Sequence, residues 1–100
     1  MIDYKTKNGA TIVYLSGEID HHSSDLLRRE IDEIIKKTEP ERIFLDFSDV
    51  TFCDSSGIAL VLGRYRLMNA VGGKVTLCSL PKFAENIFVL AGIDRFVSIQ

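Results

Sequence analysis

The hydrophobic positions of this chain recur with two different periods, and the two periods predict its secondary structure. Runs rich in β-branched and aromatic residues, which are typical of strands, cover residues 2–6, 10–16, 43–47, 74–78 and 96–99. Apolar residues spaced three or four apart, which are typical of one-sided helices, recur between residues 20 and 40, over 58–69, and from Pro81 to Gly92. The predicted order of elements is therefore β-β-α-β-α-β-α-β.

The first two strands are predicted to form a hairpin. They are separated by Lys7-Asn8-Gly9, and Asn-Gly is a strong hairpin signal because both residues tolerate positive φ. Ile12–Leu15 is apolar on both of its alternating sides. Such a run is typical of a strand in the interior of a sheet with helices on both faces. We therefore expect the second strand to be covered on both sides.

The first helix is predicted to be amphipathic. Its buried stripe follows the i, i+4, i+7, i+8 spacing and consists of Leu27, Ile31, Ile34 and Ile35. Its other side carries opposite charges four residues apart, namely Arg28–Asp32, Arg29–Glu33, Asp32–Lys36 and Glu33–Lys37. That side is expected to face water. Asp20 or Ser23 is suited to cap the helix N-terminus.

The order of elements predicts an α/β fold. Strands connected through helices run parallel, whereas the opening hairpin adds one antiparallel pair. The result is a mixed, mostly parallel sheet with helices packed on it. With 100 residues, 46% of them hydrophobic, the chain is expected to form a single domain over residues 1–100. The turn after the 43–47 strand then lies where open α/β sheets usually place their sites.

The second helix is apolar on more than one side. Its predicted core positions are Ile58, Val61, Leu62, Tyr65 and Met68. Leu60 and Leu67 lie on a different side of the helix. Either neighbouring helices cover these two leucines, or they form an exposed apolar patch that binds another protein.

The candidate site is Asp54-Ser55-Ser56-Gly57, which joins the 43–47 strand to the second helix. Unpaired N–H groups and the helix dipole at such a position favour an anionic oxygen. A serine here could simply cap the helix, although position 58 is Ile where Glu or Gln would complete a capping box. The alternative is that a serine accepts a phosphoryl group. A phosphate on Ser55 would crowd Asp54 and mainly change the outward surface.

The sequence gives less support to other chemistry. A serine hydrolase would need Gly-x-Ser-x-Gly, and Cys53 occupies the first glycine position. His21 and His22 are adjacent at a helix start, so their side chains point in different directions. No further Cys or His lies at a spacing that suits a metal site. We therefore expect no metal and no cofactor. Asp20 is of more interest, because its strand-to-helix loop could lie near the Ser55 loop.

Composition narrows the classes of partner. The net charge is −2 with dispersed Lys and Arg, so neither nucleic-acid binding nor a polybasic membrane patch is expected. No leader-like N-terminus and no apolar run near 18 residues occurs, which favours a cytoplasmic location and no membrane contact. Cys53 and Cys78 are expected to be buried and reduced. At this size a monomer is the simplest expectation.

Three segments together resemble the anti-sigma-factor antagonists of the STAS domain family, most closely those of sporulation. These segments are Gly17–His22, Asp54–Ile58 and Gly63–Arg66, and the resemblance spans essentially the whole chain. The expected fold is then the STAS fold. Members of the family commonly continue into another C-terminal helix, whereas this sequence stops at Gln100.

The resemblance implies a regulatory protein rather than an enzyme, with no catalytic residues. Such a protein binds an anti-sigma factor that is also an ATP-dependent serine kinase, and so releases the sigma factor for transcription. The kinase phosphorylates the first serine, Ser55, which ends binding, and a serine phosphatase resets the cycle. The implied partner surface consists of Asp20, Asp54, Ser55, Ser56, Gly57 and Ile58. The alternatives are a STAS interaction domain of another assembly, such as a general stress pathway, or a serine hydrolase acting through Ser55.

Overall fold

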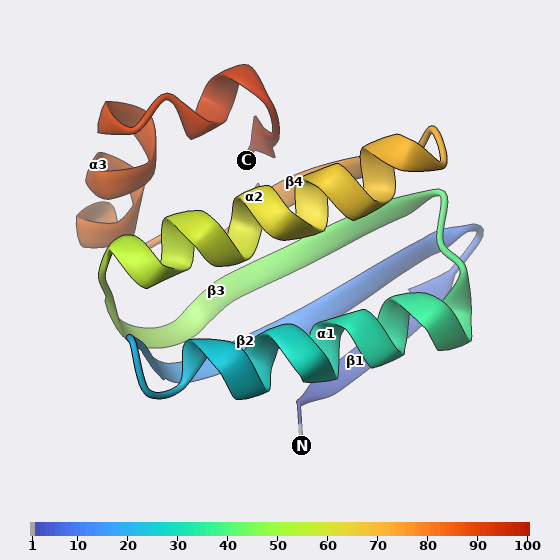
Figure 1. The fold of residues 1–100 in the computed structure, drawn as a ribbon, viewed down its shortest axis with the longest axis horizontal. Coiled ribbons are helices and arrows are strands. Elements are labelled where there is room, and N and C mark those ends of the chain that lie inside the picture. Colours follow the sequence, from blue (N-terminus) through green and yellow to red (C-terminus); the bar gives the residue numbers. More distant parts are fainter. Residues whose placement is uncertain (1) are drawn as a thin grey trace.

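The protein is built on a five-stranded sheet with helices packed on it, as a computed structural model that describes residues 2–100 shows (Figure 1). The strands are β1 (Asp3–Lys7), β2 (Ala10–Ile19), β3 (Arg42–Cys53), β4 (Lys74–Cys78) and β5 (Ser98–Ile99). The helices are α1 (Ser24–Thr38), α2 (Ser55–Ala70), α3 (Lys82–Leu90) and the short 3₁₀ helix η1 (Ile93–Arg95). β1 pairs antiparallel with β2, and β2 to β5 run parallel in sequence order. The predicted mixed α/β class is confirmed.

The hairpin between β1 and β2 forms at the predicted turn. Asn8 and Gly9 both have positive φ, 50° and 79°, which places the two strands in direct antiparallel register from Lys7–Ala10 onwards. The turn is therefore of the kind that the Asn-Gly pair predicts.

Only one face of the sheet is covered by helices. Along β2, Thr11, Val13 and Leu15 are buried, whereas Ile12 and Tyr14 on the opposite face are only half-buried. The prediction that this strand is covered on both sides is wrong. The strand order β2-β3-β4 explains the outcome, because successive right-handed crossovers in one direction put α1 and α2 on the same side of the sheet (Figure 1).

Several elements are longer or shorter than the pattern predicts. β2 extends to Ile19 and β3 to Cys53, beyond their predicted ends. The pattern does not predict these extensions because the pairing shifts register beyond Tyr14, and the shift breaks the alternation of apolar and polar residues that marks a strand. α2 starts at Ser55 instead of residue 58. At the C-terminal end η1 precedes a strand of only two residues, where a four-residue strand was expected.

A buried ion pair joins α1 to α2. The predicted stripe of α1 is buried at Leu27, Ile31 and Ile34, but Asp32 beside it faces α2 instead of open water. Arg64, which is 5% exposed, brings its Nε to 2.8 Å from Asp32 Oδ1. The angle does not suit a hydrogen bond, so the attraction is mainly electrostatic. Burial lowers the pKa of Arg64, and the Asp32 carboxylate opposes that shift.

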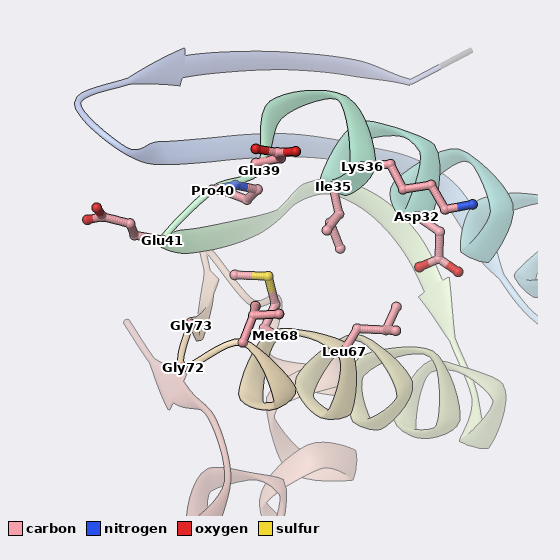
Figure 2. Close-up of a pocket in the computed structure, with 11 residues that line it drawn as sticks. Asp32, Ile35, Lys36, Glu39, Pro40, Glu41, Leu67, Met68, Gly72 and Gly73 are labelled. Carbon is pink, nitrogen blue, oxygen red and sulfur yellow. The ribbon is translucent and has the colours of Figure 1, made fainter.

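Leu60 and Leu67 have different surroundings. Leu60 is buried, so neighbouring elements do cover it, whereas Leu67 is about half exposed. Leu67 lines a groove of about 600 Å³ between the C-terminal halves of the two helices, where Ile35 of α1 points toward Leu67 and Met68 (Figure 2). This groove starts about 18 Å along the helix from Ser55, so Leu67 does not form an apolar patch beside the serines.

We expect Asp32→Ala to lower the free energy of unfolding by about 3 kcal/mol, because it leaves the Arg64 guanidinium buried without its counter-charge. Glu33→Ala, at an exposed neighbouring position, is the control and should change stability by no more than about 0.5 kcal/mol. Urea unfolding measures both. Equal effects of the two substitutions would contradict a stabilising role for the pair.

Candidate functional site

The site lies where β2 and β3 end side by side. Ile19 pairs with Cys53 across the two strands, and the Asp54 N–H donates to the Ile19 carbonyl at 3.2 Å. The loop that starts at Asp20 and the turn that holds Ser55 are therefore neighbours at the carboxyl edge of the sheet (Figure 1). The expectation that these two loops lie near each other is confirmed.

Asp54, not a serine, caps α2. Its carboxylate accepts a hydrogen bond from the Ser56 N–H at 2.8 Å, and its carbonyl accepts one from the Gly57 N–H at 2.9 Å. Ser55 is the first residue of the helix and is exposed, while Ser56 is half-buried. The cap function that a serine could have served is thus taken by its neighbour, and the Ser55 hydroxyl faces solvent.

Gly57 lets the first turn of α2 approach the end of β3 closely. A Cβ at this position would lie 2.3 Å from Cys53 Sγ, and Phe88 of α3 and Ile19 of β2 stand next to the same point. Any side chain here would force the helix away from the sheet. Gly57 is itself buried, so its contribution to a partner surface would come through the position of the helix.

Cys53 is an inert thiol under the site. It is 2% exposed, and burial together with the neighbouring Asp54 charge raises its pKa to about 11. The raised pKa keeps the sulfur protonated and unreactive at neutral pH. Cys78 is only half-buried, so the expectation of a buried pair of cysteines holds for Cys53 alone.

Asp20 organises the loop before α1. Its Oδ1 accepts hydrogen bonds from the backbone N–H groups of His22 and Ser23, both at 2.9 Å. The Ser23 hydroxyl in turn donates to the Glu18 carbonyl at 2.6 Å and accepts from the Asp20 N–H. Hydrogen bonds from Ser23 lower the pKa of Asp20 despite its contact with solvent. The side chain is a fixed negative group on the edge that carries Ser55.

A shallow hollow of about 340 Å³ connects the starts of α1 and α2. It is lined by His21, Ser24, Asp25 and Arg28 on one side and by Ser56, Ala59 and Leu60 on the other. The α1 residues were not among the predicted site residues. Their spacing was a usable signal, because Ser24 and Arg28 lie four apart and face the same direction. The Arg28 guanidinium forms an ion pair with Asp25 at 2.7 Å. It also lies 3.9 Å from the Asp32 carboxylate, so the predicted Arg28–Asp32 pair forms.

Asp20, His21 and His22 interact mainly within their own loop. The Asp20 carboxylate binds backbone N–H groups of its own loop, so its hydrogen bonds do not orient an imidazole as a catalytic base would need. His21 and His22 stack edge to face with their ring centres 5.9 Å apart. Over residues 2–100, no group of three or more His, Cys, Asp or Glu side chains is placed to hold a metal. In the same range no helix is long and apolar enough to cross a membrane.

The sequence as a whole has known relatives. The family model described as "STAS domain" matches residues 1–100. The chain belongs to the STAS domain family. An anti-sigma F factor antagonist of Paenibacillus polymyxa is 37% identical over 98% of this chain and 84% of its own length. An anti-sigma-B factor antagonist of Bacillus subtilis is 26% identical over 99% of this chain and 89% of its own length.

Solved structures share the fold and the family. The anti-sigma factor antagonist SpoIIAA in its unphosphorylated form matches with a TM-score of 0.82 at 28% identity, over all of this chain and 88% of its own. The phosphorylated form of SpoIIAA matches with a TM-score of 0.75, also at 28% identity, over all of this chain and 91% of its own. The predicted STAS fold and the resemblance to antagonists of the SpoIIAA type are confirmed.

Gly57→Ala should destabilise the protein by about 1–3 kcal/mol, because the added methyl group meets Cys53 Sγ. Gly63→Ala is the matched control in the same helix, since nothing lies within 4 Å of a Cβ there. That substitution should stabilise by about 0.5–1 kcal/mol through helix propensity. Chemical denaturation measures the free energy of unfolding of both variants. If both substitutions stabilise the protein, a methyl group at position 57 fits beside Cys53 and the expected clash is absent.

A second expectation concerns alkaline pH. The Cys53 thiol ionises near its ordinary value of 9 in the unfolded chain and only near 11 in the folded one, so its contribution to stability is complete below pH 9 and is lost as pH rises toward 11. We expect the stability difference between wild type and Cys53→Ser to shift by about 2 kcal/mol against the wild type between pH 8 and pH 11. A difference that stays constant with pH would mean that the thiol is not desolvated.

Proposed function

We propose that this protein is an anti-anti-sigma factor whose binding is switched off by phosphorylation of Ser55. In its unphosphorylated form it binds an anti-sigma factor, and the sigma factor held by that protein is released to direct transcription. The anti-sigma factor is also the ATP-dependent serine kinase that modifies Ser55, and a serine phosphatase restores the hydroxyl. The protein acts as a substrate and a switch, in the cytoplasm with the transcription machinery, and needs no catalytic residues or cofactor of its own.

The observation that carries the proposal is the exposed Ser55 hydroxyl at a helix N-terminus that Asp54 already caps. A hydroxyl that serves as a cap is tied to backbone N–H groups and is poorly accessible to another enzyme. Here the carboxylate takes that function, so the serine can be modified without loss of the cap. The relationship to anti-sigma factor antagonists over nearly the whole chain supports the same assignment.

Charge accounts for the switch. A phosphate adds about −1.5 to −2 charges at neutral pH, next to Asp54 and near Asp20 on the same edge. In an interface that excludes water, such an unpaired group costs several kcal/mol, and each 1.4 kcal/mol lowers affinity tenfold. SpoIIAA, at 28% identity, has been solved in both unphosphorylated and phosphorylated forms, which supports phosphorylation as the switch in this chain.

The proposed partner surface consists of Asp20, Asp54, Ser55, Ser56 and Ile58. These side chains are exposed or half-buried around the ends of β2 and β3. Gly57 belongs to the surface through its backbone position. His21 and Arg28, across the shallow hollow from Ser56, extend the surface onto α1, where the Arg28 guanidinium is paired with Asp25.

The transcription programme is proposed from the relatives. The 37% identity to an anti-sigma F factor antagonist favours positive control of sporulation. The 26% identity to an anti-sigma-B factor antagonist makes a general stress pathway the second candidate. Binding to anti-sigma F and anti-sigma B factors, measured side by side, separates the two.

The test of the switch is phosphorylation by the anti-sigma factor with Mg²⁺ and ATP, followed by mass mapping. One phosphate is expected, on Ser55, because its hydroxyl is the exposed one of the two serines in the turn. Ser55→Ala should block it and keep its affinity for the anti-sigma factor, while Ser55→Asp should bind at least about tenfold more weakly by calorimetry.

Ser56→Ala is the matched control, one residue further along the helix and half-buried. It should still receive one phosphate, on Ser55, because the acceptor hydroxyl is intact. Full phosphorylation of the Ser55→Ala variant, or loss of the phosphate only in Ser56→Ala, would show that the acceptor has been assigned to the wrong hydroxyl.

A further inference from the structure

The face of the sheet opposite the helices is an organised surface. Its centre is formed by the half-buried side chains Ile12, Tyr14 and Phe44, with Thr76 and Cys78 beside them. α1 and α2 both lie on the other side (Figure 1). Alternate residues on a strand point to opposite faces, so the residues that pair directly with these five share their face.

The charges on this open face are separated along the strands. Residues that pair across neighbouring strands form rows that run across the sheet. At the amino ends of β3 and β4, one such row contains Lys7, Arg42 and Lys74, and the next row on this face, toward the carboxyl ends, contains Lys5. Toward the carboxyl ends of β2 and β3, the next row contains Asp3 and Asp46. Asp49 and then Glu18 follow in separate rows further along the two strands. Four positive charges therefore occupy one half of the face, and four negative charges the other half.

The basic side chains leave their charged ends available. Lys5 Nζ lies 5.9 Å from the centre of the Tyr14 ring, and the Arg42 guanidinium lies 6.0 Å from the centre of the Phe44 ring. Their aliphatic stems thus lie along the apolar centre while the charges remain at the surface. Arg42, Lys74 and Lys5 are all exposed.

We propose that this face binds a second copy of the same chain, forming a weak two-fold dimer in which the two sheets pack face to face with their strands antiparallel. A two-fold axis in the plane of the interface and perpendicular to the strands reverses the strand direction of the second copy. The basic half of each face then meets the acidic half of the other. An axis parallel to the strands would instead place like charges together, so the charge pattern selects one arrangement.

The size of the face fits a reversible dimer. The four strands lie about 4.8 Å apart, and at about 3.3 Å per residue β1 and β4, with 5 residues each, are only half as long as β2 with its 10 residues. Such a face offers roughly 500 Å² on each copy, so a dimer buries about 1,000 Å², the threshold for a specific interface. We therefore expect a dissociation constant between about 10 µM and 1 mM at low salt.

The dimer leaves both sites for the proposed partner free. Ser55 follows the carboxyl end of β3, beyond the edge of the sheet. Because the strands of the two copies run in opposite directions, the two Ser55 turns lie at opposite ends of the dimer. One dimer can then hold two partner molecules. The dimer itself does not depend on the proposed function, since no residue of the Ser55 turn takes part in it.

Charge exchange tests the interface. In the first variant, Arg42→Glu and Lys74→Glu make the basic half acidic; in the second, Asp3→Lys and Asp49→Lys make the acidic half basic. All four positions are exposed, so both variants should fold, which circular dichroism and urea unfolding verify. Sedimentation velocity at 10 µM to 1 mM protein and low salt reports self-association of wild type, of each variant alone and of their equimolar mixture.

The wild type should dimerise with rising concentration and dissociate at high salt. Each variant alone should self-associate at least about tenfold more weakly, and the mixture should associate at least as tightly as the wild type, because the two altered faces are complementary. A wild type that stays monomeric to 1 mM overturns the proposal and leaves the face to a different partner. Variants that dimerise like the wild type, or a mixture that fails to associate, overturn it as well.

Discussion

The contact between the first turn of α2 and the end of β3 is the constraint on which the site depends. Position 57 has no side chain, and the sulfur of Cys53 occupies the space where one would be. The helix can therefore start immediately after the strand, with a single residue, Asp54, between them. Because that residue also bonds to the end of β2, the two loops that carry the polar side chains are held together by backbone geometry.

The turn between β3 and α2 gives two functions to two adjacent polar residues. Asp54 satisfies the backbone at the helix N-terminus, and Ser55 is left to face solvent. A negative charge beside the hydroxyl makes the surface sensitive to further negative charge. The helix cap and the proposed phosphorylation site thus rest on neighbouring side chains, so that the proposed modification of Ser55 leaves the cap at Asp54 in place.

Most of the fold could be predicted from the period of the hydrophobic residues, and the failures have physical causes. The hairpin, the stripe of α1 and the parallel order follow from local pattern and from the geometry of connections. The open face of β2 was missed because the apolar residues Ile12 and Tyr14 imitate a strand covered twice, although they lie among charged residues of β1 and β3. The extensions of β2 and β3 were missed because a shift in register destroys alternation.

The site was predictable in part. The order strand, Asp-Ser-Ser-Gly, helix indicated where the hydroxyls lie, but a sequence cannot show which of three polar side chains caps the helix. Arg64 was missed as a core residue because a charged side chain inside the buried stripe is unexpected until Asp32 is placed opposite it on another helix. His21 and Arg28 became neighbours of Ser56 only through the parallel pairing of β2 with β3.

α2 is anchored along its whole length. Its first turn rests on Cys53, its middle is tied to α1 through Arg64 and Asp32, and its last turn receives a 2.7 Å hydrogen bond from the Gly73 N–H to the Met68 carbonyl. Because the helix is held at three points, we expect the proposed phosphate on Ser55 to change the surface around it without moving the helix. Under the proposed function, the time needed to release the anti-sigma factor would then be set by dissociation and diffusion, with no slow rearrangement of the chain in between.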